Sequence, residues 1–398
     1  MNVLFVNDIA FNPSYGGIER VTDNIVKGLI ALGKGYNFYY LFFKTHKREI
    51  LQYEFPARIF ECPSEGGFDS TENIEYYIDI LNEYRIDVVV NQRGSISIMN
   101  KAISLTQRSK VVSVIHSDIN YWVYRKRFLY HHTCNQSLAT TCKYILKKTN
   151  PYLWSKYVSW TVKPYLKSHY NEIANISDAI VVLSKQYIKD VESYNEDSNT
   201  KIYSIPNPNT FCTQDVDFSL MRNEILYIGR LDSTEKAPML LLQIWRKIYK
   251  KHLDWKLVIV GEGYAKDEMI AYVDKHKLPR VFFEGAKCNV EDYYKSASLV
   301  CLTSVSEGWG MALTEGMTYG CVPFTFNNSG SSYDIIDNDI NGCLISAYNI
   351  NEYAKRLSYV ISNKSKRFAM GKCALEKSKM FSVENVVRQW DVLFENIV

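Results

Sequence analysis

Two glutamates eight residues apart, Glu307 and Glu315, are the acidic side chains best placed for chemistry in this 398-residue sequence. They lie in the string SEGWGMALTEG, which follows a run typical of a strand and opens a run typical of a helix. Gly308 and Gly310 allow a backbone to approach a ligand closely. Taken alone, however, the pair is explained better by a capped helix that carries two solvated acids.

The sequence also offers groups that suit phosphate oxygens. Arg230 follows the strand-like run Glu224–Gly229, and Lys236 comes six residues after it. Two cations at the carboxyl end of a strand lie where a diphosphate needs its charge neutralised. Met311 and Ala312 begin the helix of the acidic string, and free N–H groups at a helix start also suit phosphate.

Other candidate groups carry weaker signals. His116 ends a strand-like run, but a single histidine is more often a satisfied core residue than a functional group. The letters Asp-x-Asp, used by many metal-dependent enzymes, occur at Asp215–Asp217 and Asp337–Asp339, where turn chemistry explains them better. The nine cysteines are scattered, so we expect reduced thiols and no essential metal.

Strands and helices must alternate to position these groups. Short β-type runs alternate with helical patterns along most of the chain, which predicts parallel sheets with helices on both faces. In the first half we expect a helix at Gly17–Leu32 and strands at Asn2–Asn7, Tyr36–Phe43, Val88–Asn91, Val111–His116 and Asp178–Leu183. We expect residues 121–170 to be helical, interrupted by Pro151 and Pro164. In the second half we expect a helix at Met239–Lys250 and strands at Glu224–Gly229, Lys256–Val260, Arg280–Phe283 and Leu299–Thr303.

The chain is long enough for two domains. Pro206 and Pro208 lie in the string IPNPN, which predicts the boundary, with one Rossmann-like domain at 1–205 and a second at 206–381. A last helix within 382–398 carries an apolar stripe that needs a partner surface, and we expect it to complete the first domain. Two such domains form a cleft, with ligands at the carboxyl ends of the strands.

In their order along the chain, these motifs resemble those of the family 4 retaining glycosyltransferases, part of the glycosyl transferases group 1. The acidic string, continued as far as Pro323, resembles the family's acidic motif. The run Tyr227–Leu231 with Lys236 resembles its diphosphate-binding signature, although Ala237 stands where the family usually has glycine. The run Val258–Gly263 resembles its next strand and glycine turn; it lacks the third glycine of a dinucleotide fingerprint, so we do not expect NAD.

The resemblance covers nearly the whole chain, is weakest from about Tyr121 to Tyr170, and implies the GT-B fold. It implies that Glu315 holds a ribose, that Glu307 senses the donor sugar, and that the two cations bind the diphosphate. It implies three further groups: Gly16 and Gly17 in a turn that closes on the donor phosphates, His116 facing the donor sugar, and Lys287 in the loop that lines the base.

The expected reaction is transfer of a hexosyl group from a nucleoside-diphosphate sugar, most simply a UDP-sugar, with retention at the anomeric carbon. In this family the favoured picture is front-face attack, with the leaving diphosphate accepting the acceptor's proton. We expect a glycan or lipid-linked saccharide as acceptor, in cell-surface polysaccharide biosynthesis. An epimerase of nucleotide sugars and a non-catalytic glycan- or lipid-binding protein on the same fold are the alternatives.

Composition agrees with a globular protein, since 46% of the residues are hydrophobic and 23% are charged. No run approaches the roughly 20 apolar residues that span a bilayer. The N-terminal residues predict a strand rather than a leader, so we expect a cytoplasmic protein.

One segment has an unusual charge distribution. Residues 119–171 contain nine lysines or arginines and twelve aromatic residues, but neither aspartate nor glutamate. Such a segment suits an anionic membrane surface or lipid-linked acceptor, an ordinary solvated face, or a nucleic acid. We favour the membrane or the lipid-linked acceptor, which would place the protein at the inner face of the membrane, and we do not expect nucleic acid.

Overall fold

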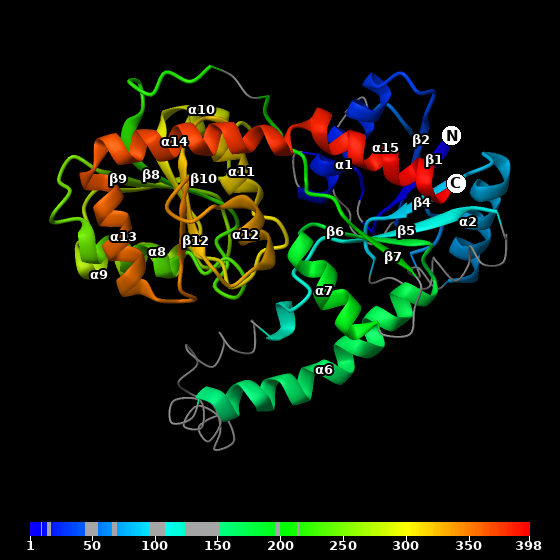
Figure 1. The fold of residues 1–398 in the computed structure, drawn as a ribbon, viewed down its shortest axis with the longest axis horizontal. Helices are drawn as coiled ribbons and strands as arrows, with labels where there is room; N and C mark the ends of the chain where they lie inside the picture. The colour runs from blue at the N-terminus through cyan, green and yellow to red at the C-terminus, as the bar shows by residue number, and fades with distance from the viewer. Residues whose placement is uncertain are drawn as a thin grey trace. The chain divides into compact units, whose positions relative to one another are not determined.

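The computed structural model describes residues 1–8, 10–13, 17–43, 55–65, 70–94, 108–123, 151–195, 200–212 and 215–398. The chain divides into two compact units. Unit 1 contains Met1–Ile119, Pro164–Thr210 and Val383–Val398, and unit 2 contains Asn120–Lys163 and Phe211–Ser382. Each unit is built around one parallel β-sheet (Figure 1).

Among the described residues, the sheet of unit 1 has seven strands in the order β3-β2-β1-β4-β5-β6-β7. Its strands are β1 (Asn2–Val6), β2 (Asn37–Phe42), β3 (Arg58–Glu61), β4 (Val88–Asn91), β5 (Lys110–Ile115), β6 (Ala179–Val182) and β7 (Lys201–Ser204). The helices that connect or cover them include α1 (Gly17–Ala31), α2 (Thr71–Glu83) and α7 (Lys185–Tyr194). Every residue of β4 and β6 is buried, as expected for a parallel sheet covered on both faces.

The strand order of unit 1 changes direction between β1 and β4. From β1 the chain passes to β2 on one side, whereas β4 lies on the other side of β1. The carboxyl ends of β1 and β4 therefore form a topological switch point, where sheets of this kind bind ligands.

The last helix of the chain packs in unit 1. Helix α15 (Val383–Ile397) lies beside α1 (Figure 1). A Cβ atom on Gly28 of α1 would lie 2.6 Å from a methyl group of Val387, so the glycine lets the two helices approach closely. Asp391 joins the contact because its carboxylate accepts hydrogen bonds from Lys34 Nζ at 2.5 Å and from Tyr36 Oη at 2.6 Å.

Helix α6 (Pro151–Asn175) has residues in both units. The sequence predicted that Pro151 and Pro164 would interrupt helix in this region. That prediction was wrong at Pro164, which lies inside α6, and at Pro151 it stays a prediction. Pro151 is the first residue of the helix, where a missing N–H has no helical partner to lose. Pro164 lies inside the helix, and its missing N–H leaves the carbonyl of the exposed Trp160 without a helical partner.

The helix continues through Pro164 because one of its faces is buried throughout. The buried residues recur every three or four positions: Val158, Val162, Leu166, Tyr170 and Ile173. The helical part of the prediction for residues 121–170 is confirmed where the structure describes it, and residues 124–150 lie outside the described residues.

Within its described part, unit 2 has a six-stranded parallel sheet in the order β10-β9-β8-β11-β12-β13. Its strands are β8 (Arg222–Ile228), β9 (Lys256–Val260), β10 (Val281–Gly285), β11 (Ala297–Cys301), β12 (Val322–Phe326) and β13 (Cys343–Ile345). Its helices include α8 (Met239–Ile248), α9 (Lys266–His276), α10 (Glu291–Ser296), α11 (Met311–Thr318), α12 (Gly330–Ile335), α13 (Ile350–Ser362) and α14 (Lys364–Ser378). The switch point of this sheet lies between β8 and β11.

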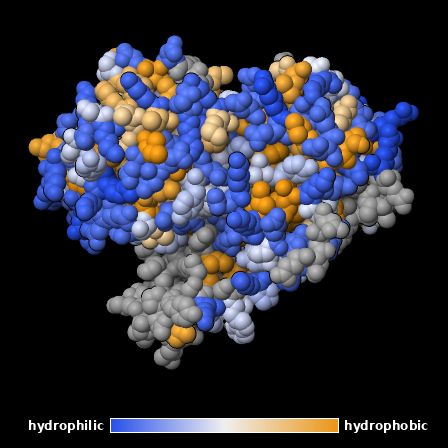
Figure 2. Space-filling model, in the orientation of Figure 1, coloured by the Kyte–Doolittle hydropathy of each residue, from blue (hydrophilic) through white to orange (hydrophobic). Residues whose placement is uncertain are grey.

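The predicted fold class, two Rossmann-like α/β domains, is confirmed by these two parallel sheets with crossover helices. The apolar side chains of the strands form the cores. On the face shown in Figure 2, hydrophilic residues predominate and hydrophobic residues lie in separate groups.

Candidate functional site

The acidic string forms the connection from β11 to α11, next to the switch point of unit 2. The chain leaves β11 at Cys301, and α11 begins at Met311. Gly310 precedes the helix with φ of 78°, a left-handed conformation that glycine adopts without strain. No side chain caps this end of α11, so the predicted N–H groups of Met311 and Ala312 lie at an uncapped helix start, which favours anions.

Glu307 is fixed by three hydrogen bonds to its carboxylate. Lys236 Nζ donates to both oxygens, at 2.7 and 2.8 Å, and Ser304 Oγ donates to Oε1 at 2.5 Å. The ion pair is largely shielded, since the side chains of Lys236 and Glu307 are 22% and 13% exposed. Lys236 and Glu307, which lie 71 positions apart in the sequence, thus form one ion pair.

The backbone of the same connection is held by side chains that the sequence did not single out. Asn328 Nδ2 donates to the carbonyl oxygens of Ser304 and Val305, at 3.0 and 2.5 Å. Tyr348 Oη donates to Val305 O at 3.1 Å, and Ser329 Oγ donates to Glu307 O. These contacts keep Glu307 in one place. Asn328 and Ser329 come two and three residues after the end of the next strand, β12, and this position was the signal that could have identified them.

Arg230 and Lys236 lie in the connection that follows β8. Arg230 Nη2 donates to Glu235 Oε2 at 2.5 Å, and the arginine side chain remains 67% exposed. Lys236 is followed by Ala237, whose φ of 42° is left-handed. Alanine stands here in place of the family's glycine, and the structure shows a strained conformation at this position, which typically costs about 1–2 kcal/mol.

This connection is joined to the acidic string by backbone contacts. Val305 N–H donates to Glu235 O at 2.7 Å, and Thr303 Oγ1 donates to Ala237 O at 3.0 Å. The cationic segment and the acidic segment therefore form one structural block at the carboxyl ends of β8 and β11.

Two glycines after β9 allow this block to form. A Cβ atom on Gly261 would lie 1.9 Å from Gly229 O, and one on Gly263 would lie 2.3 Å from Leu231 O. Both have a positive φ, of 144° and 156°. The glycine turn that the sequence identifies thus packs against the backbone of Gly229 and Leu231, the two neighbours of Arg230 in the chain.

Glu315 lies inside the same unit, on α11. Its side chain is buried, and Oε2 accepts a hydrogen bond from Tyr294 Oη at 2.9 Å. Tyr294 stacks on Tyr319, with ring centroids 6.3 Å apart. Glu315 therefore has a fixed orientation, set by an aromatic cluster that the sequence did not predict.

Lys287 follows β10 in the loop that the sequence assigned to the base. Its side chain is 39% exposed, and Nζ lies 3.9 Å from Glu284 Oε2. Glu284 also accepts a hydrogen bond from Tyr293 Oη at 2.9 Å. In unit 2 the structure thus brings Arg230, Lys236, Glu307 and the start of α11 together at one end of the sheet, with Glu315 inside α11 and Lys287 beyond β10.

The remaining predicted residues belong to unit 1. Gly17 is the first residue of α1, whereas Gly16 lies outside the described residues. His116 follows β5, and its Nε2 lies 2.5 Å from Gln92 Oε1. Burial, helped by the nearby Arg93 guanidinium, lowers the pKa of His116 to about 3, so the imidazole is neutral. Arg93 is paired with Asp8 at 2.5 Å.

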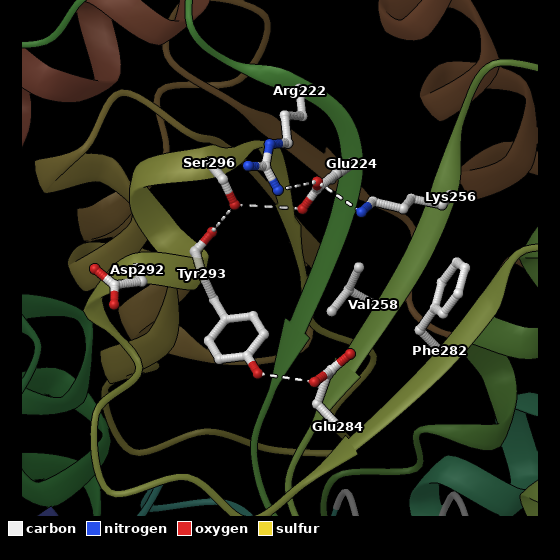
Figure 3. Close-up of a pocket in the computed structure, with 9 residues that line it drawn as sticks. All are labelled: Arg222, Glu224, Lys256, Val258, Phe282, Glu284, Asp292, Tyr293 and Ser296. Carbon is white, nitrogen blue, oxygen red and sulfur yellow. Dashed lines mark hydrogen bonds and ion pairs between the residues drawn. The ribbon is translucent and has the colours of Figure 1, made fainter.

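A pocket of about 320 Å³ lies elsewhere in unit 2, on one face of β8, β9 and β10 beside α10 (Figure 3). The residues that line it are Arg222, Glu224, Lys256, Val258, Phe282, Glu284, Asp292, Tyr293 and Ser296. None of the predicted site residues is among them. Its buried acid, Glu224, is paired with Lys256 at 2.9 Å, so this charge is already neutralised. We therefore place the chemistry at the block around Glu307 rather than in this pocket.

Both Asp-x-Asp strings lead into turns, in which Leu220 N–H donates to Asp217 O and Ile340 N–H donates to Asp337 O. Three of their four acids have other side-chain contacts. Asp217 accepts hydrogen bonds from the N–H and the hydroxyl of Ser219, Asp337 pairs with Lys377 at 2.7 Å, and Asp339 pairs with Arg356. Within the described residues, no three histidine, cysteine, aspartate or glutamate side chains gather as metal ligands would. In that same part of the chain, no helix is long and apolar enough to cross a membrane.

Comparison with known proteins adds independent findings. A family model described as Glycosyl transferases group 1 matches residues 213–377, and one described as Glycosyltransferase Family 4 matches residues 15–208. An uncharacterized glycosyltransferase of Haemophilus influenzae is 24% identical over 95% of this chain and 96% of its own length. The amylovoran biosynthesis glycosyltransferase AmsD of Erwinia amylovora is 28% identical over 44% of this chain and 48% of its own.

Among solved structures, HepE of Anabaena in complex with UDP and glucose has a TM-score of 0.73 at 15% identity. The match covers the whole of both chains. At this identity the likeness establishes the GT-B arrangement of the fold and no more.

Proposed function

Since the chain belongs to the glycosyl transferases of group 1, family 4, we propose that it transfers a hexosyl group from a UDP-sugar to a saccharide acceptor with retention. The observation that carries the proposal is the Lys236–Glu307 pair beside Arg230 at the uncapped start of α11. Cations and a helix start suit a diphosphate, and a fixed carboxylate beside them suits sugar hydroxyls.

The chemistry follows from these groups. The bond between the anomeric carbon and the diphosphate oxygen breaks, and the acceptor oxygen bonds to the same face of that carbon. The acceptor's proton passes to the leaving diphosphate. Arg230, Lys236 and the N–H groups of Met311 and Ala312 stabilise the charge that builds up on this diphosphate, which is electrostatic catalysis. No step needs a metal, and we propose that none is essential.

The two glutamates have different roles in this proposal. Glu315 holds the ribose, so it contributes to binding of any nucleotide, whereas Glu307 contacts the sugar. Calorimetric titration with UDP and a transfer assay test this division. Glu315→Ala should weaken UDP itself by about tenfold, the effect of one lost hydrogen bond of about 1.4 kcal/mol. Glu307→Ala should mainly impair transfer, and an equal loss of UDP affinity in both variants would contradict the division.

A first experiment tests the donor. UDP-, GDP- and ADP-sugars are screened for an increase in the melting temperature, because a ligand that binds the native state stabilises it. UDP-hexoses should give the largest increase, and a preference for GDP- or ADP-sugars would contradict the UDP assignment. The accepted donor is then incubated without an acceptor: slow hydrolysis fits a transferase, whereas a new sugar nucleotide epimer would assign an epimerase.

We propose that the acceptor is a glycan or lipid-linked saccharide in cell-surface polysaccharide biosynthesis, met at the inner face of a membrane. The name of AmsD, a glycosyltransferase of amylovoran biosynthesis, supports the polysaccharide part. Helix α6 supports the membrane part, because one line of exposed residues recurs at helical spacing: Leu153, Lys156, Trp160, Lys163 and Lys167. Apolar side chains interleaved with lysines suit an anionic bilayer surface.

A further inference from the structure

A second pocket of unit 2, of about 260 Å³, lies at the opposite end of the sheet from the block around Glu307. It is lined by the start of β8, by Asp254 and Trp255 just before β9, and by the junction of α13 and α14 (Figure 1). In a parallel sheet the amino ends of the strands lie together, away from the carboxyl ends. The seven residues of β8 therefore separate this pocket from Arg230 by about 20 Å, at about 3.3 Å per residue.

The side chain that distinguishes this pocket is Arg367, in the first turn of α14. It is only 6% exposed, and its guanidinium carbon lies 4.9 Å from the centre of the Trp255 ring. Nη1 donates to the carbonyl oxygens of Val360 and Ile361, at 3.1 and 2.7 Å. These carbonyls belong to the last turn of α13, so one end of the guanidinium caps that helix.

The opposite edge of the guanidinium has no acceptor in the protein. Nε is buried without a hydrogen-bond partner, and Nη2 donates to no acceptor in the part of the chain that the structure describes. Burial lowers the pKa of Arg367 below its usual value, and the nearby Asp254 only partly offsets this. Since buried donors and charges are costly to leave unpaired, this edge calls for an anionic partner.

The free edge has the geometry of a bidentate anion site. Nε–H and Nη2–H point the same way in the plane of the guanidinium, and two such parallel donors bind both oxygens of a carboxylate or a phosphate. The charged residues that line the pocket are Lys364, Arg367 and Asp254, which leaves one positive charge in excess. The pocket therefore suits a single carboxylate or phosphate group.

Other polar groups of the pocket can accept hydrogen bonds from hydroxyl groups. Ser219 Oγ donates its proton to Asp217 Oδ1 at 2.6 Å, and Asp254 Oδ2 accepts from Asn223 Nδ2 at 2.6 Å. Ser219 Oγ and Asp254 Oδ1 therefore remain as acceptors. The volume also exceeds that of an oxyanion group alone, since a water molecule takes up only about 30 Å³ of the liquid. These features favour a ligand with hydroxyl groups beside its anionic group.

We propose that this pocket binds a small sugar acid, either a uronic acid or a sugar phosphate, whose carboxylate or phosphate accepts two hydrogen bonds from Nε and Nη2 of Arg367. Lys364 attracts the same anionic group, and Ser219 and Asp254 accept hydrogen bonds from the sugar hydroxyls. The site uses none of the residues assigned to the donor, so it can be tested independently of the proposed function.

Proton–nitrogen NMR of the protein labelled with ¹⁵N-arginine observes Nε–H of Arg367 directly. Arg367→Lys identifies its signal, and proximity to the Trp255 ring identifies it in the wild type if that variant does not fold. Glucuronate or glucose 1-phosphate should shift the signal, whereas glucose, and sodium chloride at the same ionic strength, should leave it in place. A response to only one of the two acids would assign the site to the carboxylate or to the phosphate. A signal that neither acid moves, or that chloride moves as far, would overturn the proposal.

Charge variants test whether the acid lies in this pocket. Lys364→Gln should weaken its binding about threefold and Asp254→Asn should strengthen it about threefold, effects of the size expected for one exposed charge. Lys372→Gln is the matched control, because Lys372 is an exposed cation of the same helix that does not line the pocket, and it should bind the acid like wild type. Equal affinities in Lys364→Gln and Lys372→Gln, with no gain in Asp254→Asn, would contradict the proposal.

A last variant separates this pocket from the block around Glu307, which also suits phosphate. Arg230→Ala should leave the titration of the Arg367 signal unchanged, because Arg230 lies at the other end of the sheet. Loss of the response in Arg230→Ala would place the acid at the block around Glu307 and overturn the proposal.

Discussion

Replacement of Gly261 by alanine tests whether the site depends on close contact between backbones. Gly261 follows β9, and a Cβ atom there would lie 1.9 Å from Gly229 O, far inside contact distance. Neither partner can move freely, because Gly261 N–H donates to Gly285 O at 2.8 Å and Gly229 N–H donates to Val260 O at 3.1 Å. The glycine also has φ of 144°, which other residues rarely adopt.

The expected loss of stability combines two effects. A strained backbone conformation costs on the order of 1–3 kcal/mol, and overpacking typically costs a further 1–3 kcal/mol, so Gly261→Ala should lose about 2–6 kcal/mol. For a domain of this size, that lowers the melting temperature by at least about 4 °C. The variant should also bind UDP more weakly, because Gly229 precedes Arg230 in the chain.

Scanning calorimetry and UDP titration measure both effects, and Gly285→Ala is the matched control. Gly285 lies in the same sheet with φ of 72°, but its added Cβ would meet only the flexible end of the Glu262 side chain, at 3.1 Å. The control should therefore lose only the cost of the left-handed conformation, about 1–2 kcal/mol. Equal losses in the two variants would refute the argument that the backbone contact limits this position.

Three further predictions concern other parts of the molecule. Burial disfavours the ionised Asp391, but hydrogen bonds from Lys34 and Tyr36 outweigh it and hold its pKa below the usual value. The ionised Asp391 therefore stabilises the folded protein at a pH above the carboxyl group's unfolded pKa of about 3.9. This stabilisation is lost as the pH falls through the pKa of Asp391 in the folded protein. In urea unfolding, the wild type should have a larger free energy of unfolding than Asp391→Asn at neutral pH, and this difference should disappear in acid. A difference that persists in acid would contradict this explanation. Transfer activity should be complete in the presence of a chelator, and abolition restored by Mg²⁺ or Mn²⁺ would disprove the absence of an essential metal. Co-sedimentation with anionic vesicles should fall several-fold in Trp160→Ser on α6, while Tyr359→Ser, an exposed aromatic on α13, should bind like wild type; equal binding to anionic and neutral vesicles would exclude the membrane surface.

The sequence was informative wherever the chemistry and the fold depend on neighbours in the chain. The acidic string could be placed at the start of a helix because glycines and apolar residues follow one another in a local pattern. Most strands of both sheets were predictable for the same reason, since runs such as Val88–Val90 are apolar throughout. The strands β3, β7, β12 and β13 were not identified from such runs. Helix α6 was the exception, because a buried face on both sides of Pro164 outweighed the local preference of proline.

The contacts that fix the site were not predictable, since they join segments far apart in the chain. Asn328 and Tyr348 hold the backbone next to Glu307 across 20 residues or more. Gln92 lies 24 residues before His116, and nothing in the local sequence marks it as the hydrogen-bond partner of that histidine. The two glycines at 261 and 263 did indicate a turn, but not the backbone against which that turn packs.

The position of α15 has a consequence for the synthesis of the protein. The helix that covers Gly28 and bonds to Lys34 and Tyr36 is encoded about 350 codons after them. On the ribosome, α1 therefore emerges long before the helix that covers it, and unit 2 can fold in the meantime. The first unit to be translated is thus the last to be completed. Until α15 arrives, the uncovered face of α1 is a surface that a chaperone could bind.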